Sequence, residues 1–323
     1  SDVCSSDLGE PTSGTGSRGH WCRLGGRETS ARFGIIRATP HGENPLKDFA
    51  TVEWDAESEE DCRQIVRLAM REELHRGYDW TTVAMVPAES RGAADVVARQ
   101  AGVLSGLVAA KVLLEASNVD VTLQAFLADG QPVQASQKIA TISGSARDLL
   151  TMERTLLNLL GRMSGIATLT ARFCDAVCGR RVKILDTRKT TPTLRALEKY
   201  AVAVGGGTNH RLGLFDAAMI KDNHRAILDA RGTTALSEAV IAIRKAHPQL
   251  PIIIEADTLD DVARAVAAGA NHILLDNMTL DELREAVALV AGRAKLEASG
   301  GVRLATVREI AETGVDYISV GAL

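Results

Sequence analysis

The second half of the chain repeats one unit, a short apolar strand followed by an amphipathic helix. Strands are expected at 182–185, 217–220, 252–254, 272–275, 295–296 and 317–320. Strands that alternate with such helices form parallel sheets. With six or seven units, we expect a closed or nearly closed parallel α/β barrel rather than an open sheet.

The expected starts and ends of the helices support this division. Three threonines precede an acidic residue by three positions, a spacing typical of a capped helix N-terminus: Thr258, Thr279 and Thr306. Three glycines lie where the helices are expected to end: Gly269, Gly292 and Gly314. A leucine-rich solenoid is disfavoured because its L-x-x-L-x-L spine is missing. A dinucleotide-binding fold is disfavoured because no G-x-G-x-x-G loop follows a strand.

The first half of the chain has a different pattern. A helix is expected from Glu57 to Gly77, strands at 82–86, 94–97 and 119–126, and a helix at 106–114. A long helix at about 145–177 connects this part to the barrel. We therefore expect a small α/β domain at 46–150 and a catalytic barrel at 151–323. Residues 1–45 are rich in Gly, Ser, Thr and Arg, which predicts a disordered or non-native extension.

Composition excludes several classes of protein. The formal net charge is −4 and aromatic residues make up 3% of the chain, which argues against nucleic-acid binding through basic grooves or stacked bases. No apolar run is long enough to span a bilayer. The cysteines form no C-x-x-C pair, so a reducing cytoplasm is the expected compartment. Cys174 and Cys178, one helical turn apart, are expected to be small buried residues rather than metal ligands.

Cationic side chains gather in one short stretch of this acidic chain. Among those in residues 183–224, six stand in polar groups that each follow a short apolar run: Arg188, Lys189, His210, Arg211, Lys221 and His224. Such a cluster is expected where a highly anionic small ligand is held. His224 is set apart, because it can equally cap a helix or hold Asp222.

The ends of the expected barrel strands carry most of the polar residues. In a parallel α/β barrel, the carboxyl ends of the strands face the active site. Read in order, these ends are Thr187-Arg188-Lys189, Lys221-Asp222-Asn223, Glu255, Asp276-Asn277, Glu297-Ala298-Ser299-Gly300-Gly301 and Gly321-Ala322. A purely structural barrel has no need for cations, carboxylates and glycine loops together at these positions.

Two features of these strand ends suit a phosphorylated sugar. Glycines at Gly300 and Gly301 let backbone N–H groups approach a phosphate, and the helix that follows adds favourable polarity. The loop around Gly321 would lie beside them. Glu255 and Asp276 occupy equivalent places in neighbouring units, which suits Mg²⁺ or the two hydroxyls of a ribose.

Long strings of residues in this order resemble the quinolinate phosphoribosyltransferases, a family of type II phosphoribosyltransferases. The strings are E-R-T-L-L-N-L-L-G-R-M-S-G-I-A-T, D-T-R-K-T-T-P, E-K-Y-A-V-A-V-G-G-G-T-N-H-R, I-K-D-N-H and E-A-S-G-G-V. The resemblance covers about 55–323. It implies an N-terminal α/β sandwich domain and an incomplete, TIM-like α/β barrel. Members of the family continue beyond the position of Leu323, so the resemblance also implies a truncated C-terminus.

The resemblance further implies a reaction. Quinolinate and phosphoribosyl pyrophosphate would give nicotinate mononucleotide, pyrophosphate and carbon dioxide, a Mg²⁺-dependent step of NAD biosynthesis catalysed by a pentosyltransferase. The family works as homodimers or larger assemblies such as hexamers, with a site shared between subunits. The implied partners are therefore the two substrates and a second copy of the chain, with no nucleic acid or membrane.

The resemblance also implies roles for individual residues. Five would surround the carboxylates of quinolinate: Arg154 (lent by the other subunit), Arg188, His210, Arg211 and Lys221. Lys189, with Thr187 beside it, would lie between quinolinate and the pyrophosphate. Glu255 and Asp276 would hold Mg²⁺, directly or through water, and the ribose hydroxyls. The 5′-phosphate would be bound by Ser299, Gly300, Gly301, Val320, Gly321 and Ala322. Lys189, Lys221, Glu255 and Asp276 are the expected catalytic residues.

Three other interpretations stay open at this point. A Schiff-base aldolase would also place a lysine at a strand end, although it would not need three arginines. A related phosphoribosyltransferase could act on another base. A non-enzymatic protein that has lost activity is the third, and it is disfavoured by the retention of every charged residue of the motifs.

Overall fold

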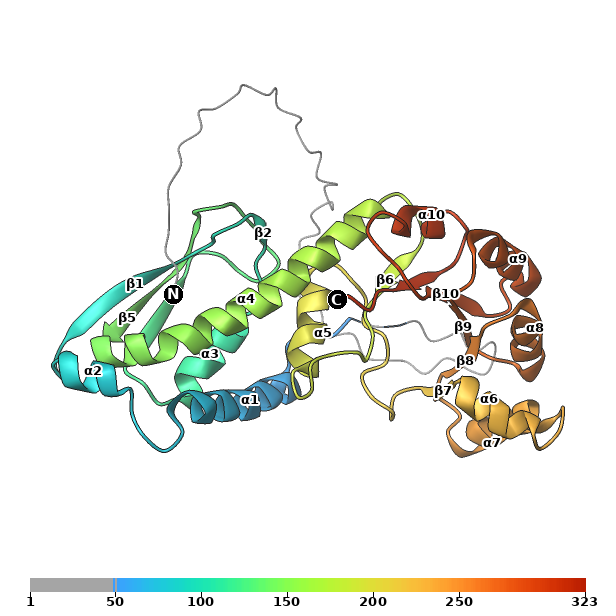
Figure 1. The fold of residues 1–323 in the computed structure, drawn as a ribbon, viewed down its shortest axis with the longest axis horizontal. Helices are drawn as coiled ribbons and strands as arrows, with labels where there is room; N and C mark the ends of the chain where they lie inside the picture. The colour runs from blue at the N-terminus through green and yellow to red at the C-terminus, as the bar shows by residue number, and fades with distance from the viewer. Residues whose placement is uncertain (1–48, 50) are drawn as a thin grey trace, which may run out of the picture. The chain divides into compact units, whose positions relative to one another are not determined.

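A computed structural model describes Phe49 and residues 51–323 (Figure 1). The extension expected at 1–45 lies outside these residues. None of the helices within the described part combines the length and the apolar character that crossing a bilayer requires.

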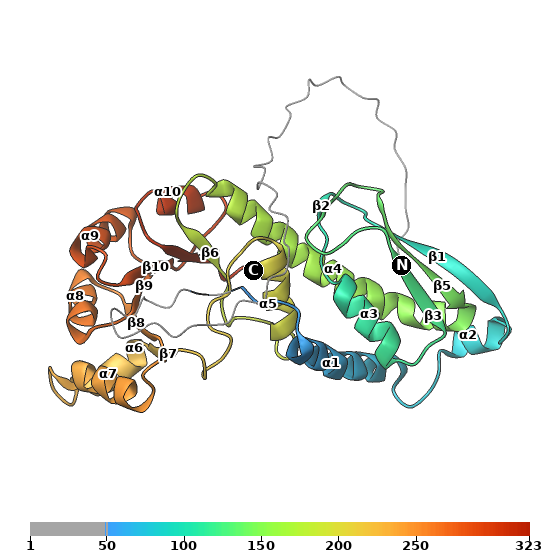
Figure 2. The same ribbon diagram turned by 180° about the vertical axis from the view of Figure 1, so that it is seen from behind.

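The N-terminal part is built on a small antiparallel sheet. Its strands are β1 (Arg91–Val97), β5 (Lys138–Ser145) and β3 (Val121–Ala125), paired in that order. A separate pair is formed by β2 (Gly102–Val103) and β4 (Pro132–Val133). Helices α1 (Ala56–Leu74), α3 (Leu107–Ala116) and the start of α4 (Ala146–Ala176) share one buried apolar cluster with this sheet (Figures 1 and 2). The predicted mixed α/β fold is confirmed for this half.

One expected strand is wrong. Residues 82–86 lie largely in a short helix, α2 (Trp80–Met85). The Asp79 side chain accepts hydrogen bonds from the backbone N–H and the hydroxyl of Thr82, which satisfies donors at the helix start. The β-branched residues Thr82 and Val83 suggested a strand, but the cap at Asp79 favours a helical turn.

The C-terminal part is a six-stranded parallel sheet with helices outside it (Figure 1). Its strands are β6 (Lys183–Leu185), β7 (Ala218–Ile220), β8 (Ile252–Ala256), β9 (His272–Asp276), β10 (Lys295–Ser299) and β11 (Tyr317–Ser319). The helices are α5 (Arg195–Val204), α6 (Asp222–Asp229), α7 (Ala235–Ala246), α8 (Leu259–Ala268), α9 (Leu280–Val290) and α10 (Val307–Ala311).

The strand order makes this sheet an open barrel. The order is β6-β11-β10-β9-β8-β7, so the first strand pairs with the last and the curled sheet is open between β6 and β7. At this seam an isolated bridge joins Leu185 to Thr208, a residue of the loop before β7. The incomplete TIM-like barrel expected from the sequence is confirmed, and its seam brings the 205–217 loop to the end of β6.

The predicted helix signals are mostly confirmed. Thr258 and Thr279 cap α8 and α9 by accepting bonds from the N–H groups of Asp261 and Glu282. Gly269 ends α8 in a left-handed conformation. The capping box expected at Thr306 is wrong, because its hydroxyl instead accepts a bond from the N–H of Arg303 in the preceding turn.

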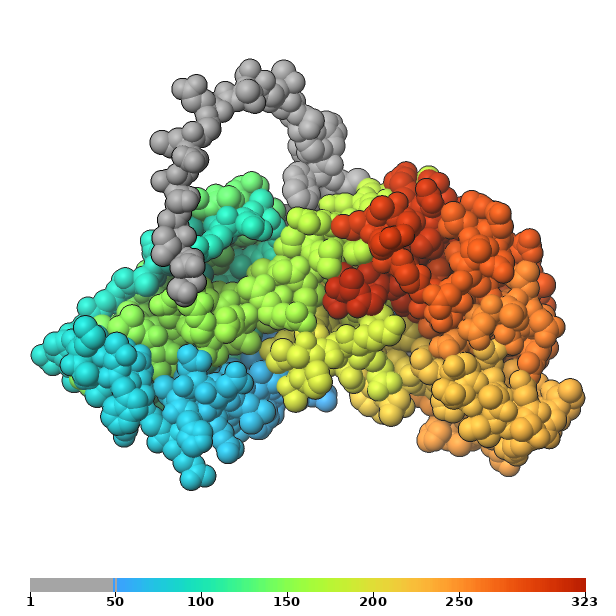
Figure 3. Space-filling model, viewed as in Figure 1, coloured from blue at the N-terminus to red at the C-terminus, as the bar shows by residue number. Residues whose placement is uncertain are grey.

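The long helix α4 belongs to both halves of the fold. Its residues from Leu149 to Ile166 are part of the apolar cluster of the small domain, whereas Phe173 packs in the barrel cluster. The domain boundary expected at 150–151 lies within this helix. Part of the surface of this helix is visible in Figure 3. Among its side chains, Leu150 is 49% exposed.

The two cysteines near the end of this helix differ in environment. Cys174 is partly buried, and burial raises the pKa of its thiol to about 11. Cys178 is exposed, which corrects the expectation that both are buried. It lies beyond the end of α4, so the helical periodicity that predicted its burial does not reach it.

Candidate active site

The expected site residues of the barrel strands all follow or end a strand at its carboxyl end. His210 and Arg211 instead belong to the seam loop that precedes β7. Parallel strands place these ends at one edge of the sheet. Register confirms the alignment of neighbours, since Ser299 on β10 pairs with Asp276 on β9.

Two arginines approach each other at the seam. Arg211 is buried, and its guanidinium donates to the carbonyl of Ala217 at 3.0 Å. Burial lowers the pKa of Arg211, and the charge of nearby Arg188 lowers it further. The Nε of Arg188 is buried and has no hydrogen-bond partner among the described residues. Two cations held together with an unsatisfied donor form a good receptor for an anion.

Lys189 lies beside the loop that follows β11. Its backbone N–H donates to the hydroxyl of Thr187 at 3.0 Å, which shapes the turn after β6. A Cβ placed on Gly321 would lie 3.8 Å from the Cδ of Lys189. The N–H of Val320 donates to the carbonyl of Leu185, which ties the two strand ends together. Lys189 and the 320–322 loop therefore border the same space.

Lys221 and Glu255 form an ion pair across adjacent strands. The Nζ of Lys221 is 3.4 Å from Oε2 of Glu255. The Nδ1 of His224 accepts a hydrogen bond from the N–H of Lys221 at 3.0 Å. His224 thus caps the start of α6, one of the two roles considered for it, and in doing so it orders the backbone of Lys221.

Three carboxylates gather at the ends of β8 and β9. One oxygen each from Glu255, Asp257 and Asp276 lies within 4.8 Å of the others. Asp257 was not among the predicted residues. It is also paired with Arg225, which is buried and holds Asp261 as well. Oxygen atoms in such a group suit a hard cation such as Mg²⁺.

The turn after β10 requires glycine. Gly300 has a φ of +101°, and a Cβ there would lie 2.1 Å from Oδ1 of Asn277. The amide of Asn277 in turn donates to Asp276 at 2.9 Å. The glycine turn is therefore in contact with the carboxylate group. Helix α10 begins only at Val307, so its N-terminus does not adjoin this turn as expected.

The imidazole of His210 points into the barrel rather than toward Arg188. Its Nε2 is 3.2 Å from Oε2 of Glu297, and the Nε2 of His272 is 2.7 Å from the same oxygen. The hydroxyl of Ser319 donates to Glu297 as well. Burial would raise the pKa of Glu297, but the two histidines outweigh burial and hold it below its usual range.

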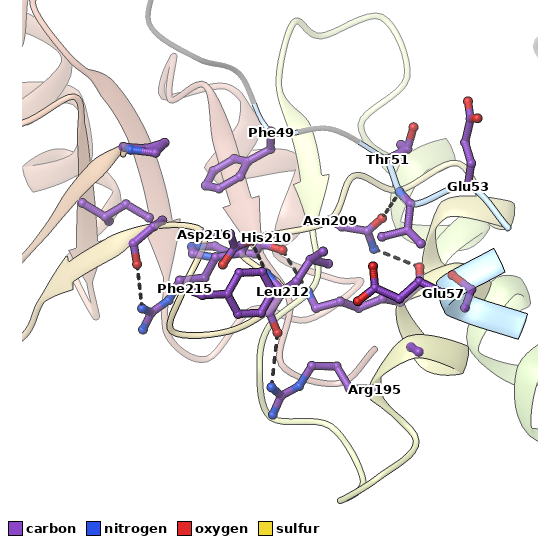
Figure 4. Close-up of a pocket in the computed structure, with 18 of the residues that line it drawn as sticks. Phe49, Thr51, Glu53, Glu57, Arg195, Asn209, His210, Leu212, Phe215 and Asp216 are labelled. Atoms are coloured by element: carbon purple, nitrogen blue, oxygen red, sulfur yellow. Dashed lines mark hydrogen bonds between the residues drawn. The ribbon is translucent and has the colours of Figure 1, made fainter. Parts of the chain in front are cut away.

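A cavity of about 660 Å³ opens at the opposite, amino-terminal end of the barrel strands (Figure 4). Figure 4 shows Phe49 over His210, with their ring centroids 4.7 Å apart. Other lining residues stand at strand starts, such as Asn271 and Lys295. His210 and Arg211 line this cavity, whereas Glu255, Asp276 and the glycine turn do not. The cavity therefore adjoins the seam loop and not the carboxylate group.

A buried polar network around Asp186 was not predicted from the sequence. Asp186 accepts hydrogen bonds from Nζ of Lys199 at 2.6 Å, from Nδ2 of Asn209 at 2.7 Å and from the N–H of His210 at 2.7 Å. All of these residues are buried. They occur in the same sequence strings as the predicted site residues, and their burial could not be inferred from type, because lysine and aspartate are seldom inside.

Arg154 is remote from this group in the sequence and lies on α4 in the small-domain half. It is exposed, and no ion pair within residues 51–323 involves it. A depression of about 270 Å³ is lined by its sequence neighbours on α4, mostly apolar residues such as Leu150 and Leu157 together with the acidic Glu153. The structure of one chain does not bring Arg154 to the other predicted residues.

Comparison with known proteins agrees with this arrangement. The sequence model of the quinolinate phosphoribosyl transferase N-terminal domain family matches residues 79–164. The sequence model of the corresponding C-terminal domain family matches residues 166–323. The chain is 46% identical over 267 residues to the nicotinate-nucleotide pyrophosphorylase (carboxylating) of Mycobacterium leprae, covering 81% of this chain and 92% of that protein.

Two further relatives extend the comparison. A probable nicotinate-nucleotide pyrophosphorylase (carboxylating) of Synechocystis is 42% identical over 257 residues, covering 78% of this chain and 85% of that protein. The solved nicotinate-nucleotide pyrophosphorylase of Francisella tularensis superposes with a TM-score of 0.77 at 33% identity, covering 85% of this chain and 95% of the other. The chain belongs to the quinolinate phosphoribosyl transferase family.

Proposed function

We propose that this protein transfers the phosphoribosyl group of phosphoribosyl pyrophosphate to quinolinate, with decarboxylation. The products are nicotinate mononucleotide, pyrophosphate and carbon dioxide, as in de novo NAD biosynthesis. The observation that carries the proposal is the division of the strand ends into two sides. Arg188, Arg211 and Lys221 supply positive charge on one side, and the carboxylates with the glycine turn lie on the other.

The cationic side fits quinolinate, which is a dianion. Charge-assisted hydrogen bonds contribute about 1.5–3 kcal/mol each, so several are needed to hold a dianion beside a second, more highly charged substrate. The unsatisfied Nε of Arg188 supports a role in binding a carboxylate. Lys189, between this side and the 320–322 loop, is suited to contact both substrates.

The chemistry needs positioning more than a protein nucleophile. The ring nitrogen of quinolinate attacks the anomeric carbon, and the bond from that carbon to pyrophosphate breaks. The ring is then positively charged, so it accepts the electron pair left when the adjacent carboxylate departs as carbon dioxide, and a proton takes its place. Lys189 and Lys221 stabilise negative charge on the departing groups by electrostatics.

The donor set at β8 and β9 fits a magnesium ion. Glu255, Asp257 and Asp276 offer oxygen atoms within 4.8 Å of one another, and hard oxygen ligands are those that Mg²⁺ prefers. Glu255 and Asp276 would hold the ion, directly or through water, and would bind the ribose hydroxyls. The ion would supply charge neutralisation for the pyrophosphate group.

The position of Arg154 supports a site shared between two copies of the chain. The residue is exposed on α4, where its sequence neighbours line a mostly apolar depression, a surface suited to a homodimer contact, alone or within a hexamer. Arg154 of one subunit would then complete the quinolinate side of the other. A cytoplasmic location is part of the same proposal, since both substrates are small soluble anions.

The direct test is an assay with quinolinate, phosphoribosyl pyrophosphate and Mg²⁺. We expect equimolar nicotinate mononucleotide, pyrophosphate and carbon dioxide. Nicotinate in place of quinolinate serves as a control for the acceptor and should give little product. If no nicotinate mononucleotide forms from quinolinate, the proposed reaction is wrong. A related enzyme for another base would be revealed by turnover of that base, and an aldolase by trapping of an imine with borohydride.

A further inference from the structure

Two adjacent residues of α5 contact both loops that carry the arginines of the site. Glu198 and Lys199, here called the α5 pair, are 2% and 1% exposed. Buried charged residues are rare unless they are paired, since removing charges from water costs several kcal/mol. Both residues bond to segments that carry proposed substrate-binding arginines, which offers an explanation for their retention inside the fold.

Lys199 holds the loop that carries Arg211. Its Nζ donates to Oδ1 of Asp186 at 2.6 Å and to the carbonyl of His210 at 3.0 Å. Asp186 accepts two further bonds from this loop, from Nδ2 of Asn209 and from the N–H of His210. The loop is thereby fixed to the end of β6 on both sides of residue 210. Burial raises the pKa of Asp186 and lowers that of Lys199, and the attraction between the two groups opposes both shifts.

Glu198 holds the loop that carries Arg188 and Lys189. Its Oε2 accepts from the N–H of Thr191 at 3.1 Å. Its Oε1 accepts from two nitrogens of Arg162 on α4, at 2.6 and 3.1 Å. Arg162 also donates to the hydroxyl of Thr191. The turn after β6 is therefore tied to α5 and α4 at its far end, while Asp186 anchors its near end.

The two loops need such a restraint because they meet at the open seam. Arg188 and Arg211 repel each other, and no continuous ladder of backbone bonds joins β6 to β7. Without a ligand, flexible loops would let the two cations move apart. The free energy needed to bring them together again would weaken ligand binding. Because Glu198 and Lys199 lie on one turn of α5 and bond to both loops, they remove most of that cost.

We propose that Glu198 and Lys199 are positioning residues that hold the Arg188 and Arg211 loops at the spacing a dicarboxylate ligand requires. This inference rests on the proposed function, since it takes quinolinate as the natural ligand. It predicts that the α5 pair affects the binding of quinolinate only. Binding of phosphoribosyl pyrophosphate, on the side of Glu255 and the glycine turn, should depend on it little.

The test compares two variants in the intact protein. Glu198→Gln keeps an oxygen for the N–H of Thr191 but loses the charge that Arg162 contacts. The double variant Asp186→Asn with Lys199→Met removes both charges, so that no unpaired buried charge remains. For both, we expect the KM for quinolinate to rise about tenfold or more, with less than about a twofold change in the KM for phosphoribosyl pyrophosphate. Lys199→Arg should behave more like wild type than the double variant does.

The control is another Lys–Asp pair of the barrel, one that is partly exposed. Nζ of Lys295 is 2.7 Å from Oδ1 of Asp316 at the amino-terminal end of the barrel. Lys295→Met with Asp316→Asn should lower thermal stability and leave the KM for quinolinate unchanged. If the α5 variants raise both KM values equally, or neither, the assignment is wrong. Glu198→Gln decides the question by itself if the double variant does not fold.

A binding measurement separates this inference from the proposed reaction. Phthalate has the two adjacent carboxylates of quinolinate without the ring nitrogen, so it can bind but cannot react. Calorimetric titration of phthalate into wild type and variants should show about tenfold weaker binding in the variants. If wild type binds phthalate but makes no nicotinate mononucleotide, the proposed reaction is wrong. The positioning role of the α5 pair is then still supported by weaker phthalate binding in the variants. If phthalate binds wild type and variants with equal affinity, the positioning role assigned to the α5 pair is wrong.

Discussion

Lys221 and Glu255 face each other from neighbouring strands, with 3.4 Å between Nζ and Oε2. Glu255 is buried at 8% exposure, whereas the side chain of Lys221 is 49% exposed. The contact lies at the border between the cationic side of the proposed site and its acidic side. The ammonium is therefore held in place by the carboxylate and still open to a ligand.

The first prediction concerns that ammonium. Lys221→Met should lower kcat on the order of 10²-fold, because one preorganised electrostatic contact to the reacting groups is lost. Steady-state kinetics at saturating substrates measures the effect. Lys245, a lysine in the last turn of α7, provides the control, and Lys245→Met should leave kcat unchanged. Full turnover by Lys221→Met would exclude an electrostatic role in the chemical step.

The second prediction concerns metal dependence. Glu255→Gln and Asp276→Asn should each raise the Mg²⁺ concentration needed for half-maximal activity, because a neutral amide is a weaker ligand than a carboxylate. Titration of activity with Mg²⁺ measures this shift, and addition of a chelator should abolish wild-type turnover. Asp281→Asn, an exposed position on α9, is the control. An unchanged Mg²⁺ requirement in both variants would contradict the assigned donor set.

The third prediction concerns the glycine turn after β10. Gly300→Ala should destabilise the protein by about 2 kcal/mol and raise the KM for phosphoribosyl pyrophosphate, since the new methyl group collides with Asn277 at a positive φ. Thermal unfolding and kinetics report the two effects. Gly292 also has a positive φ but has open space around it. Gly292→Ala should therefore show a smaller loss of stability and an unchanged KM.

How much of this fold follows from the sequence depends on the kind of signal. All six barrel strands and the long helix are periodic and apolar, so their pattern predicts them closely. The predicted strand at 82–86 fails because a single capping residue, Asp79, outweighs weak β propensity in a short segment. The barrel was therefore more predictable than the small domain.

The site was predictable where chemistry and strand ends coincide. Lys189, Lys221, Glu255, Asp276 and the glycine turn lie where the alternation of strands and helices put them. His210 was expected with the arginines, yet its ring turns inward to Glu297, and no one-dimensional pattern reports which way a loop side chain points. Asp186 and Lys199 went unnoticed for a related reason, because a buried ion pair looks like two surface charges in sequence.

The fourth prediction concerns acid stability and Glu297. The pKa of Glu297 is lower in the folded protein than its unfolded value of 4.5, since His210 and His272 outweigh the effect of burial. Its contribution to stability is therefore complete above about pH 4.5 and is lost as the pH falls through the folded pKa. Glu297→Gln should be less stable than wild type by about 3 kcal/mol at pH 7.

Urea unfolding between pH 7 and pH 3 would measure that difference. The difference in stability between wild type and Glu297→Gln should narrow below about pH 4.5, because the unfolded wild type then binds a proton that the folded protein does not. Glu312→Gln, at an exposed carboxylate paired with Arg180, is the control and should show a much smaller effect at every pH. A gap that is constant over this range would show that the charge of Glu297 does not contribute.

The fifth prediction concerns sharing of the site between subunits. Arg154→Ala and Lys221→Met should each be nearly inactive as pure proteins. When the two are mixed under conditions that exchange subunits, activity should return, because a mixed dimer contains one site with both residues intact. Recovery approaching a quarter of wild type is the statistical expectation for random exchange in dimers. No recovery, despite verified exchange, would place both residues in the same subunit's site.

The open seam between β6 and β7 has a consequence for how such a barrel changes over evolutionary time. In a closed barrel, lengthening one connection shifts strand register around the whole circle. Here the 205–217 loop is joined to β6 by one backbone bridge and by side chains. A change in the length of this loop would therefore leave the register of the neighbouring strands undisturbed, whereas a change at Asn209 would break a buried bond that holds the loop beside Asp186.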